Sequence, residues 1–230
     1  MSVVKVDRTS NERSDDLKTL AAVAKTYLRS GSPRAMLLAV ALSIAARVVV
    51  ADFGWTDAVI VVAALVLVGF VEWVLHLVLL HAPDDSKRMT KYGTGSGHRR
   101  HHLDPNDVGW IMLSWQDATI FIAMFLVWTA VWVLPLALLI GAPLLASYLT
   151  GLVISYLGLA HYEWTHLLVH TRYRPRSRRY KRLAANHRLH HFRNEQHWLG
   201  VTSNLGDRVL GTLPADKSDV PLSDTARTLS

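Results

Sequence analysis

Four long apolar stretches constrain this chain more than any other feature. They cover residues 35–53, 58–80, 118–140 and 143–160. Each approaches the roughly 20 residues that an α-helix needs to cross the hydrocarbon core of a bilayer. The connections within the first pair and within the second pair are short, so we expect four transmembrane helices arranged as two hairpins. The predicted fold class is an all-α integral membrane protein.

The basic residues lie on one side of this arrangement. The net charge is +7, and every Lys and Arg except Arg47 falls within 1–34, 82–117 or 171–230. A four-span topology places these segments on one face, which the positive-inside rule assigns to the cytoplasm. We therefore expect both termini in the cytoplasm, at the plasma membrane if the protein is bacterial and at the endoplasmic reticulum if it is eukaryotic. Since topology explains the charge, nucleic-acid binding is not expected.

The remaining segments complete the predicted organisation. Residues 1–34 form a cytoplasmic segment, in which apolar residues at helical spacing from Leu17 to Leu28 indicate an amphipathic helix. Residues 35–213 form the membrane domain, whose spans carry a cytoplasmic helical cap. Residues 214–230 are mostly polar, and a disordered tail is expected there. The absence of cysteine excludes disulfides, thiolate metal sites and Cys nucleophiles.

The twelve histidines gather at the predicted cytoplasmic ends of the spans and just beyond them. Two HxxHH boxes, at 98–102 and 187–191, each begin 17 residues after a histidine at the end of a span. A shift of 89 residues carries His81, His98, His101 and His102 onto His170, His187, His190 and His191. Two boxes in matching register indicate a duplicated unit.

The spacing of these histidines favours two metal ions. Positions i, i+3 and i+4 share one face of a helix, and neutral imidazole binds iron, zinc, copper and nickel. Ten such ligands exceed the need of one ion and suit two ions held close together. His76 and His81 are five residues apart, about 140° around a regular helix. This pair therefore either serves different ions or sits on a distorted turn.

The boxes HLVLLH, GHRRHH, HLLVH and HRLHH, in this order after paired spans, resemble the fatty acid hydroxylase / sterol desaturase superfamily of membrane di-iron oxygenases. The resemblance covers residues 58–213 and includes the motif GVTSNLGDRVLGT; the stretch YKRLAANHRLHH is also similar to bacterial carotenoid hydroxylases. The metal ligands that the resemblance implies are His76, His81, His98, His101, His102, His166, His170, His187, His190 and His191.

The resemblance also implies an activity, cofactors and partners. The expected protein is an oxidoreductase that uses O₂ and external electrons to hydroxylate or desaturate a C–H bond of a fatty acyl or sterol-like lipid. It would hold two Fe ions, with zinc as a substitute in purified protein, and take its substrate from the bilayer. The sequence carries no redox module, so a separate ferredoxin, cytochrome or reductase is the expected electron donor. The alternatives are a carotenoid hydroxylase and, in another class, a membrane zinc-binding protein or metal transporter.

Several residues near the boxes stay open. His161 and His197 are possible extra ligands, and His161/His166 is the alternative to His166/His170 as the third box. The pair His166/His170 is preferred because it preserves the 17-residue gap. No catalytic residue is expected beyond the metal ligands. The polar side chains that would hydrogen-bond ligand imidazoles are Asp207, Glu163 and Asn186, with Glu72, Asp104 and Asp107 as further candidates.

Overall fold

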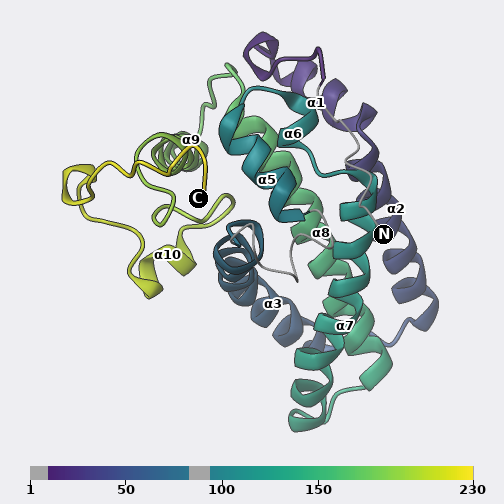
Figure 1. Ribbon diagram of the computed structural model, residues 1–230. Helices are drawn as coiled ribbons and strands as arrows, with labels where there is room; N and C mark the ends of the chain where they lie inside the picture. Colours follow the sequence, from purple (N-terminus) through teal and green to yellow (C-terminus); the bar gives the residue numbers. More distant parts are fainter. Residues whose placement is uncertain (1–9, 83–93, 230) are drawn as a thin grey trace, which may run out of the picture.

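The computed structural model describes residues 10–82 and 94–229, and within these every regular element is helical. Four long helices run through the molecule (Figure 1). They are α2 (Gly31–Val50), α3 (Trp55–Val74), α7 (Trp115–Leu139) and α8 (Leu144–His170). A π-helical turn, η2 (Leu75–Leu80), extends α3. The all-α prediction is confirmed.

The four helices are long and apolar enough to cross a membrane. Their membrane-length segments are Gly31–Val50, Trp55–Leu80, Val108–Leu139 and Leu144–His170. Many large apolar side chains on them point outward: Val49 is 84% exposed, Leu65 63% and Leu139 83%. An exposed apolar surface of this extent is unfavourable in water and is typical of helices that face lipid. The prediction of four membrane-length helices is therefore confirmed, although two of them run about ten residues beyond their expected ends.

Helix α8 lies at the centre of the bundle. Of its most apolar window 56% is buried, against 28%, 22% and 17% for the other three segments. It packs against α2, α3 and α7, and α2 also packs against α7. The α7–α8 contact is close because Gly151 has no side chain: an added Cβ would lie 2.5 Å from a methyl carbon of Val133.

Short helices gather around one end of the bundle (Figure 1). One of them, α1 (Leu20–Arg29), begins at Thr19, whose side chain accepts a hydrogen bond from the Ala22 amide. It buries Val23 and Tyr27, and the Tyr27 hydroxyl donates to the Ala160 carbonyl at 2.8 Å. The others are η1 (Ser14–Asp16), α5 (Thr94–Leu103), α6 (Val108–Ile111), α9 (Arg178–Phe192), α10 (Leu205–Leu210) and η3 (Lys217–Asp219).

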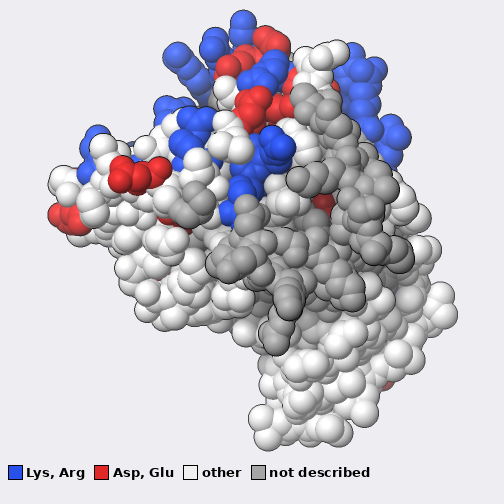
Figure 2. All heavy atoms as spheres, in the orientation of Figure 1, with Lys and Arg blue, Asp and Glu red and all other residues white. Residues whose placement is uncertain are grey.

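Charge follows the same division of the molecule. Figure 2 shows Lys and Arg side chains gathered at the end that carries the short helices, while the opposite end of this face is almost uncharged. Arg47 is the exception within the bundle. It lies near the uncharged end and is buried, with hydrogen bonds to Thr150 at 2.7 Å and to Asp57 at 2.9 Å. These bonds join α2, α3 and α8 at that end.

Residues 214–229 differ from the expectation of a disordered tail. Val220 and Ala226 are each 3% exposed, and the segment pairs with the end of α9: Arg193 donates to the Val220 carbonyl, and the Ser223 amide donates to the Arg193 carbonyl, both at 2.8 Å. A polar composition predicts disorder because it offers little apolar area to bury. Here backbone carbonyls and arginine side chains supply the contacts instead.

Candidate metal centre

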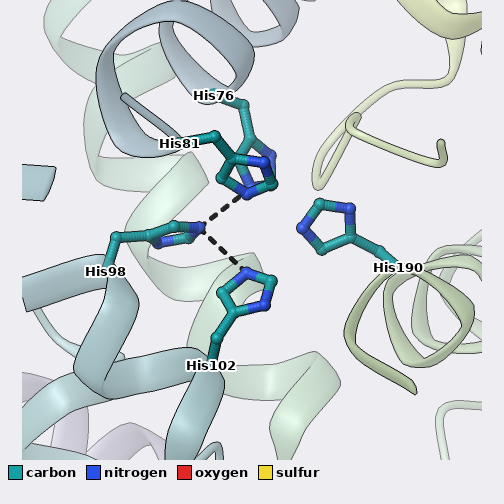
Figure 3. A group of neighbouring side chains, drawn as sticks. All are labelled: His76, His81, His98, His102 and His190. Atoms are coloured by element: carbon teal, nitrogen blue, oxygen red, sulfur yellow. Dashed lines mark hydrogen bonds between the residues drawn. The ribbon is translucent and has the colours of Figure 1, made fainter. Parts of the chain in front are cut away.

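Ten histidines lie in two groups of five at the end of the bundle where the short helices gather. Within each group, the ligand-type ring nitrogens all lie within 4.8 Å of one another. Figure 3 shows the first group, whose rings converge on a common space. The first group consists of His76, His81, His98, His102 and His190. The second group consists of His101, His166, His170, His187 and His191.

Each HxxHH box divides its three histidines between the two groups, two in one group and one in the other. The first group takes the outer residues of the first box, His98 and His102, but its fifth member is His190 of the second box. The second group takes His187 and His191 together with His101 of the first box. This division follows from helix geometry: residues i and i+4 share a face, while the residue at i+3 is turned about 100° from its neighbour at i+4. The middle histidine of each box therefore faces the other group.

The π-helical turn explains the spacing of His76 and His81. The His81 amide donates to the His76 carbonyl at 3.1 Å, an i→i+5 bond that replaces the i→i+4 bond of an α-helix. One wide turn thus brings residues five apart onto the same face, and the two ring centroids lie 4.8 Å apart. Of the two alternatives left by the sequence, the structure has the distorted turn, with both rings in the first group.

Backbone carbonyls orient four of the rings. In each case the Nδ1 atom lies within hydrogen-bonding distance of a carbonyl oxygen: His76 with Leu199 at 2.6 Å, His102 with Ala226 at 2.7 Å, His166 with Ile111 at 3.1 Å, and His190 with His197 at 2.9 Å. A carbonyl oxygen only accepts, so each Nδ1 must carry the proton. The Nε2 atom of each ring is then left with a free lone pair, the form in which imidazole binds metal.

These lone pairs converge in a way that hydrogen bonds cannot satisfy. His76 Nε2 and His102 Nε2 lie 3.1 and 3.2 Å from His98 Nε2, and a single N–H on His98 can point at only one of them. Within the part of the chain that the structure describes, neither ring nitrogen of His81 has a hydrogen-bond partner, although both are buried, and His190 Nε2 is in the same state. Buried polar atoms normally have partners, and a cation between the rings would supply one.

The second group shows the same convergence. His187 Nε2 lies 2.8 Å from His170 Nε2 and 3.1 Å from His191 Nε2. With metal–nitrogen bonds of about 2.1 Å, two nitrogens on one ion lie roughly 3.0–3.4 Å apart. The four nitrogen–nitrogen distances given for His98 and His187 are close to this range, so the donor sets fit metal ions.

Burial keeps these rings neutral. Loss of solvation lowers the pKa of His102 to about 3, although its bond to the Ala226 carbonyl acts in the opposite direction. Burial likewise holds the pKa values of His98, His101, His187 and His191 well below the usual value for histidine, and the neighbouring imidazoles add to this effect. Neutral rings keep their lone pairs available, which is what a metal ion requires.

Two buried carboxylates hold the loop behind His76. Asp207 accepts hydrogen bonds from the amides of Leu199 at 2.8 Å and Gly200 at 2.7 Å, and Glu72 accepts from the Thr202 amide at 2.7 Å. An added Cβ on Gly200 would lie 1.9 Å from the Ser203 carbonyl, so this tight turn requires glycine. Asp207 was expected to contact an imidazole; it instead fixes the loop whose Leu199 carbonyl meets His76.

The other candidates lie around the centre. Glu163 accepts from the Leu113 amide at 2.8 Å and the Ser32 hydroxyl at 2.5 Å. The amide nitrogen of Asn186 is buried without a hydrogen-bond partner among the described residues. Asp104 pairs with Arg13 at 2.7 Å, and Asp107 accepts from the Gly109 amide at 2.8 Å.

The two extra histidines lie outside both groups. The His161 ring is 3.3 Å from the Tyr180 hydroxyl and 3.3 Å from that of Thr165. The His197 ring lies 3.3 Å from the Asn194 side-chain oxygen, while its carbonyl serves His190. Of the two alternatives for the third box, the pair that lies in one group is His166/His170.

Two hollows reach the histidines from different sides. An apolar cavity between α3, α7 and α8 is lined in part by His76, His98 and His166, and its walls include Phe121 and Gly158. A second hollow opens on the charged end and reaches the second group. Its lining includes His170, His187, His191 and the exposed arginines Arg172, Arg174 and Arg188.

Sequence reasoning missed the backbone acceptors. The carbonyls of Ile111, His197, Leu199 and Ala226 orient ligand-type rings, yet nothing in a side-chain pattern marks them. The motif GVTSNLGDRVLGT carried an indirect signal, because its Asp207 holds the loop that presents the Leu199 carbonyl.

Comparison with known proteins supplies the family. A model of the fatty acid hydroxylase family matches residues 61–212, which is more than half of the chain. The chain belongs to the fatty acid hydroxylase family. The prediction made from the histidine boxes and the terminal motif is therefore confirmed, and the match includes all ten grouped histidines.

Two curated members of this family and one solved structure are similar to the chain. Dihydroceramide fatty acyl 2-hydroxylase FAH1 of Arabidopsis thaliana is 32% identical over 69% of this chain and 62% of its own length. FAH2 of the same plant is 29% identical over 64% and 57%. The chain thus spans about three-fifths of these relatives. The hydroxylase domain of full-length Scs7p shares the fold, with a TM-score of 0.64 at 22% identity over 84% of this chain and 68% of that one.

Proposed function

We propose that this family member is a membrane oxygenase that hydroxylates the fatty acyl chain of a lipid at a centre of two iron ions. The observation that carries the proposal is that two groups of five histidines border an apolar cavity, which His76, His98 and His166 help to line. Hydroxylation is favoured over desaturation because both curated relatives are named fatty acyl 2-hydroxylases.

The ten histidines would hold the two ions, five around each. The chemistry supplied by two bound iron ions would be reduction of O₂ with two external electrons and two protons from solvent, with one oxygen atom inserted into a C–H bond and the other leaving as water. Imidazole alone does not distinguish iron from zinc, so the choice of iron rests on the family. The carbonyls of Leu199, Ala226, Ile111 and His197 hold the protons of four rings away from the ions.

The apolar cavity would bind the acyl chain. Its walls come from three membrane-length helices, with Val68 on α3, Phe125 on α7 and Leu159 on α8. An alkyl chain gains free energy by leaving water for such a surface and needs no polar partner there. A chain lying in this cavity would place a methylene group beside His76, His98 and His166, while its head group stays toward the charged end.

The proposed orientation puts the histidine end in the cytoplasm. The gathering of Lys and Arg around α1, α5 and α9 supports it, since cytoplasmic segments of membrane proteins carry this excess. The turns between α2 and α3 and between α7 and α8 would then lie on the opposite face, as two hairpins. Both termini would be cytoplasmic, with the centre open to soluble partners.

A separate electron donor would approach through the hollow over the second group. Arg172, Arg174 and Arg188 line it and are exposed, which favours a donor with an acidic surface. Arg172 is 3.4 Å from Asp15, which leaves Arg174 and Arg188 as the stronger attractors. The donor is thus proposed to approach a side of the centre that the lipid does not occupy.

Lipid composition tests the proposed function. The chain is produced in a host whose lipids lack hydroxylated acyl chains, and acyl products are compared by mass spectrometry with those of the same host carrying His191→Ala. We expect acyl chains heavier by one oxygen atom with the unchanged protein alone. Equal lipid profiles, in the presence of a matched electron donor and of iron-loaded protein, would contradict the proposal.

A further inference from the structure

Residues 216–229, here called the strap, run from beyond α10 back along α9 to α5 (Figure 1). The strap contains one short helix, η3, and otherwise irregular backbone. It is nevertheless anchored by buried residues, with Val220 and Ala226 each 3% exposed and Leu229 8%. Irregular backbone of this kind is held by specific contacts rather than by its own helical or sheet hydrogen bonds.

The first anchor is α9, which carries the second box. Arg193, one residue beyond this helix, is bonded to the strap twice, through its side chain to the Val220 carbonyl and through its own carbonyl to the Ser223 amide. Two residues further, Glu195 accepts from the Thr225 hydroxyl at 2.5 Å.

The second anchor is α5, which carries the first box. Arg227 donates to the carbonyls of His102 at 2.9 Å and Leu103 at 2.6 Å. These carbonyls belong to the last turn of the helix, where no following amide is available within the helix. Arg99 donates in return to the Leu229 carbonyl at 2.5 Å. The strap therefore joins the ends of the two box-bearing helices.

Between these anchors the strap contacts the centre itself. The Ala226 carbonyl accepts from His102 Nδ1 at 2.7 Å, which fixes the proton on Nδ1 and leaves the Nε2 lone pair facing His98. No other ring of the ten is hydrogen-bonded to the strap among the described residues. The contact is thus specific to the first group.

We propose that the strap is a positioning element of the first metal site, which it completes by presenting the Ala226 carbonyl to His102. The inference rests on the proposed two-metal centre. Because the carbonyl belongs to the backbone, the position of the strap and not the identity of a side chain provides the function. Partners of this kind typically change metal affinity 10–100-fold.

The test displaces the strap at Ala226. Its buried methyl leaves no room for the long charged side chain of Ala226→Arg, whereas Ala226→Ser keeps the backbone in place. Leu222→Arg is the matched control, because Leu222 lies in the strap and is 72% exposed. Purified full-length protein is freed of metal and titrated anaerobically with Fe(II), and binding is followed by metal analysis after gel filtration.

We expect the unchanged chain, Ala226→Ser and Leu222→Arg to bind two ions with equal affinities across the three proteins. Ala226→Arg should keep one tight site and bind the other ion 10–100-fold more weakly. Two further variants, each lacking one histidine of one group, show which of the two ions is affected. In His170→Ala the remaining ion, held by the first group, should bind 10–100-fold more weakly when Ala226→Arg is added. In His81→Ala the remaining ion should be unaffected.

Three results would overturn the inference: two tight ions in Ala226→Arg, loss of both ions together, or loss of the ion held by the second group. If Ala226→Arg does not give folded protein, Arg227→Ala decides by the same titration, since it removes the two bonds to α5 from an exposed position. Failure of the unchanged chain to bind two ions would instead contradict the proposed function.

Discussion

His101 and His190 occupy equivalent places in the two boxes, yet each lies in the histidine group that contains the other two residues of the opposite box. Neither of the two histidine repeats therefore holds a complete set of five. The exchange makes the two groups one structure, because a shift of α5 against α9 alters both at once.

Substitution of the exchanged histidines tests this relationship. His190→Ala should weaken the ion bound by the first group, and His101→Ala the ion bound by the second, so that each variant retains one tight Fe(II) per chain. His161→Ala is the control, because the His161 ring contacts Tyr180 and Thr165 outside both groups. Anaerobic metal analysis measures the result. Two tight ions in His190→Ala would contradict the assignment.

Asp207 should contribute to the free energy of unfolding although no histidine ring among the described residues is hydrogen-bonded to it, because it holds the loop that presents the Leu199 carbonyl. Its two oxygens accept from separate amides, and Asp207→Asn would replace one acceptor by a donor facing an amide N–H. We expect the loss of about 1–3 kcal/mol of unfolding free energy and weaker binding of the first ion. Chemical unfolding in detergent, compared with the exposed control Asp224→Asn, measures the change. Unchanged stability of Asp207→Asn would show that the loop is held by other contacts.

The apolar cavity can be closed at Gly158. An added Cβ there would already touch Val68 at 3.4 Å, so Gly158→Leu should fill the space between α3 and α8. We expect hydroxylation of long acyl chains to fall at least tenfold, with two ions still bound. Leu157→Phe is the matched control, since Leu157 is 43% exposed. Retention of long-chain activity in Gly158→Leu would place the substrate elsewhere.

The arginines over the second group provide the test of the electron donor. Arg174→Glu with Arg188→Glu should raise the KM for an acidic donor roughly 3–10-fold at low ionic strength, with a smaller effect at high salt. Product formed in a single turnover by chemically reduced protein should not change. Arg208→Glu, on the exposed surface of α10, is the control. A KM of the double variant equal to that of the unchanged chain at low ionic strength, or an equal rise in Arg208→Glu, would exclude this hollow as the docking place.

Much of the centre could be predicted from the histidine pattern. The 17-residue gaps and the repeat at 89 residues identified eight of the ten histidines that the structure brings together, because a helix converts spacing into shared faces. The family resemblance added His76 and His166. The exchange of His101 and His190 could not be predicted, since the pattern does not say how α5 and α9 face one another. The π-helical turn at His76 could not be predicted either. A spacing of five residues between His76 and His81 is compatible with a regular helix as well as with a widened turn.

The hydrogen bonds between backbone carbonyls and the histidine rings could not be predicted from a pattern of side chains. Ala226 and Leu199 act through backbone carbonyls, which every residue has, so only the folded chain shows which of them meet a ring. The same reason explains the strap, whose polar composition predicted disorder although its carbonyls and Arg227 bind the box helices. Tight turns leave a clearer signal, and Gly200 within GVTS is an example.

The central claim is that two iron ions at the histidine groups insert oxygen into an acyl chain. Its most direct measurement is a single turnover under ¹⁸O₂ with purified, iron-loaded and chemically reduced protein, followed by mass spectrometry of the acyl product. We predict one ¹⁸O atom per hydroxylated chain, a yield that approaches one product per two irons, and no product from zinc-loaded protein. Product without ¹⁸O, or equal product from the zinc-loaded protein, would contradict the account.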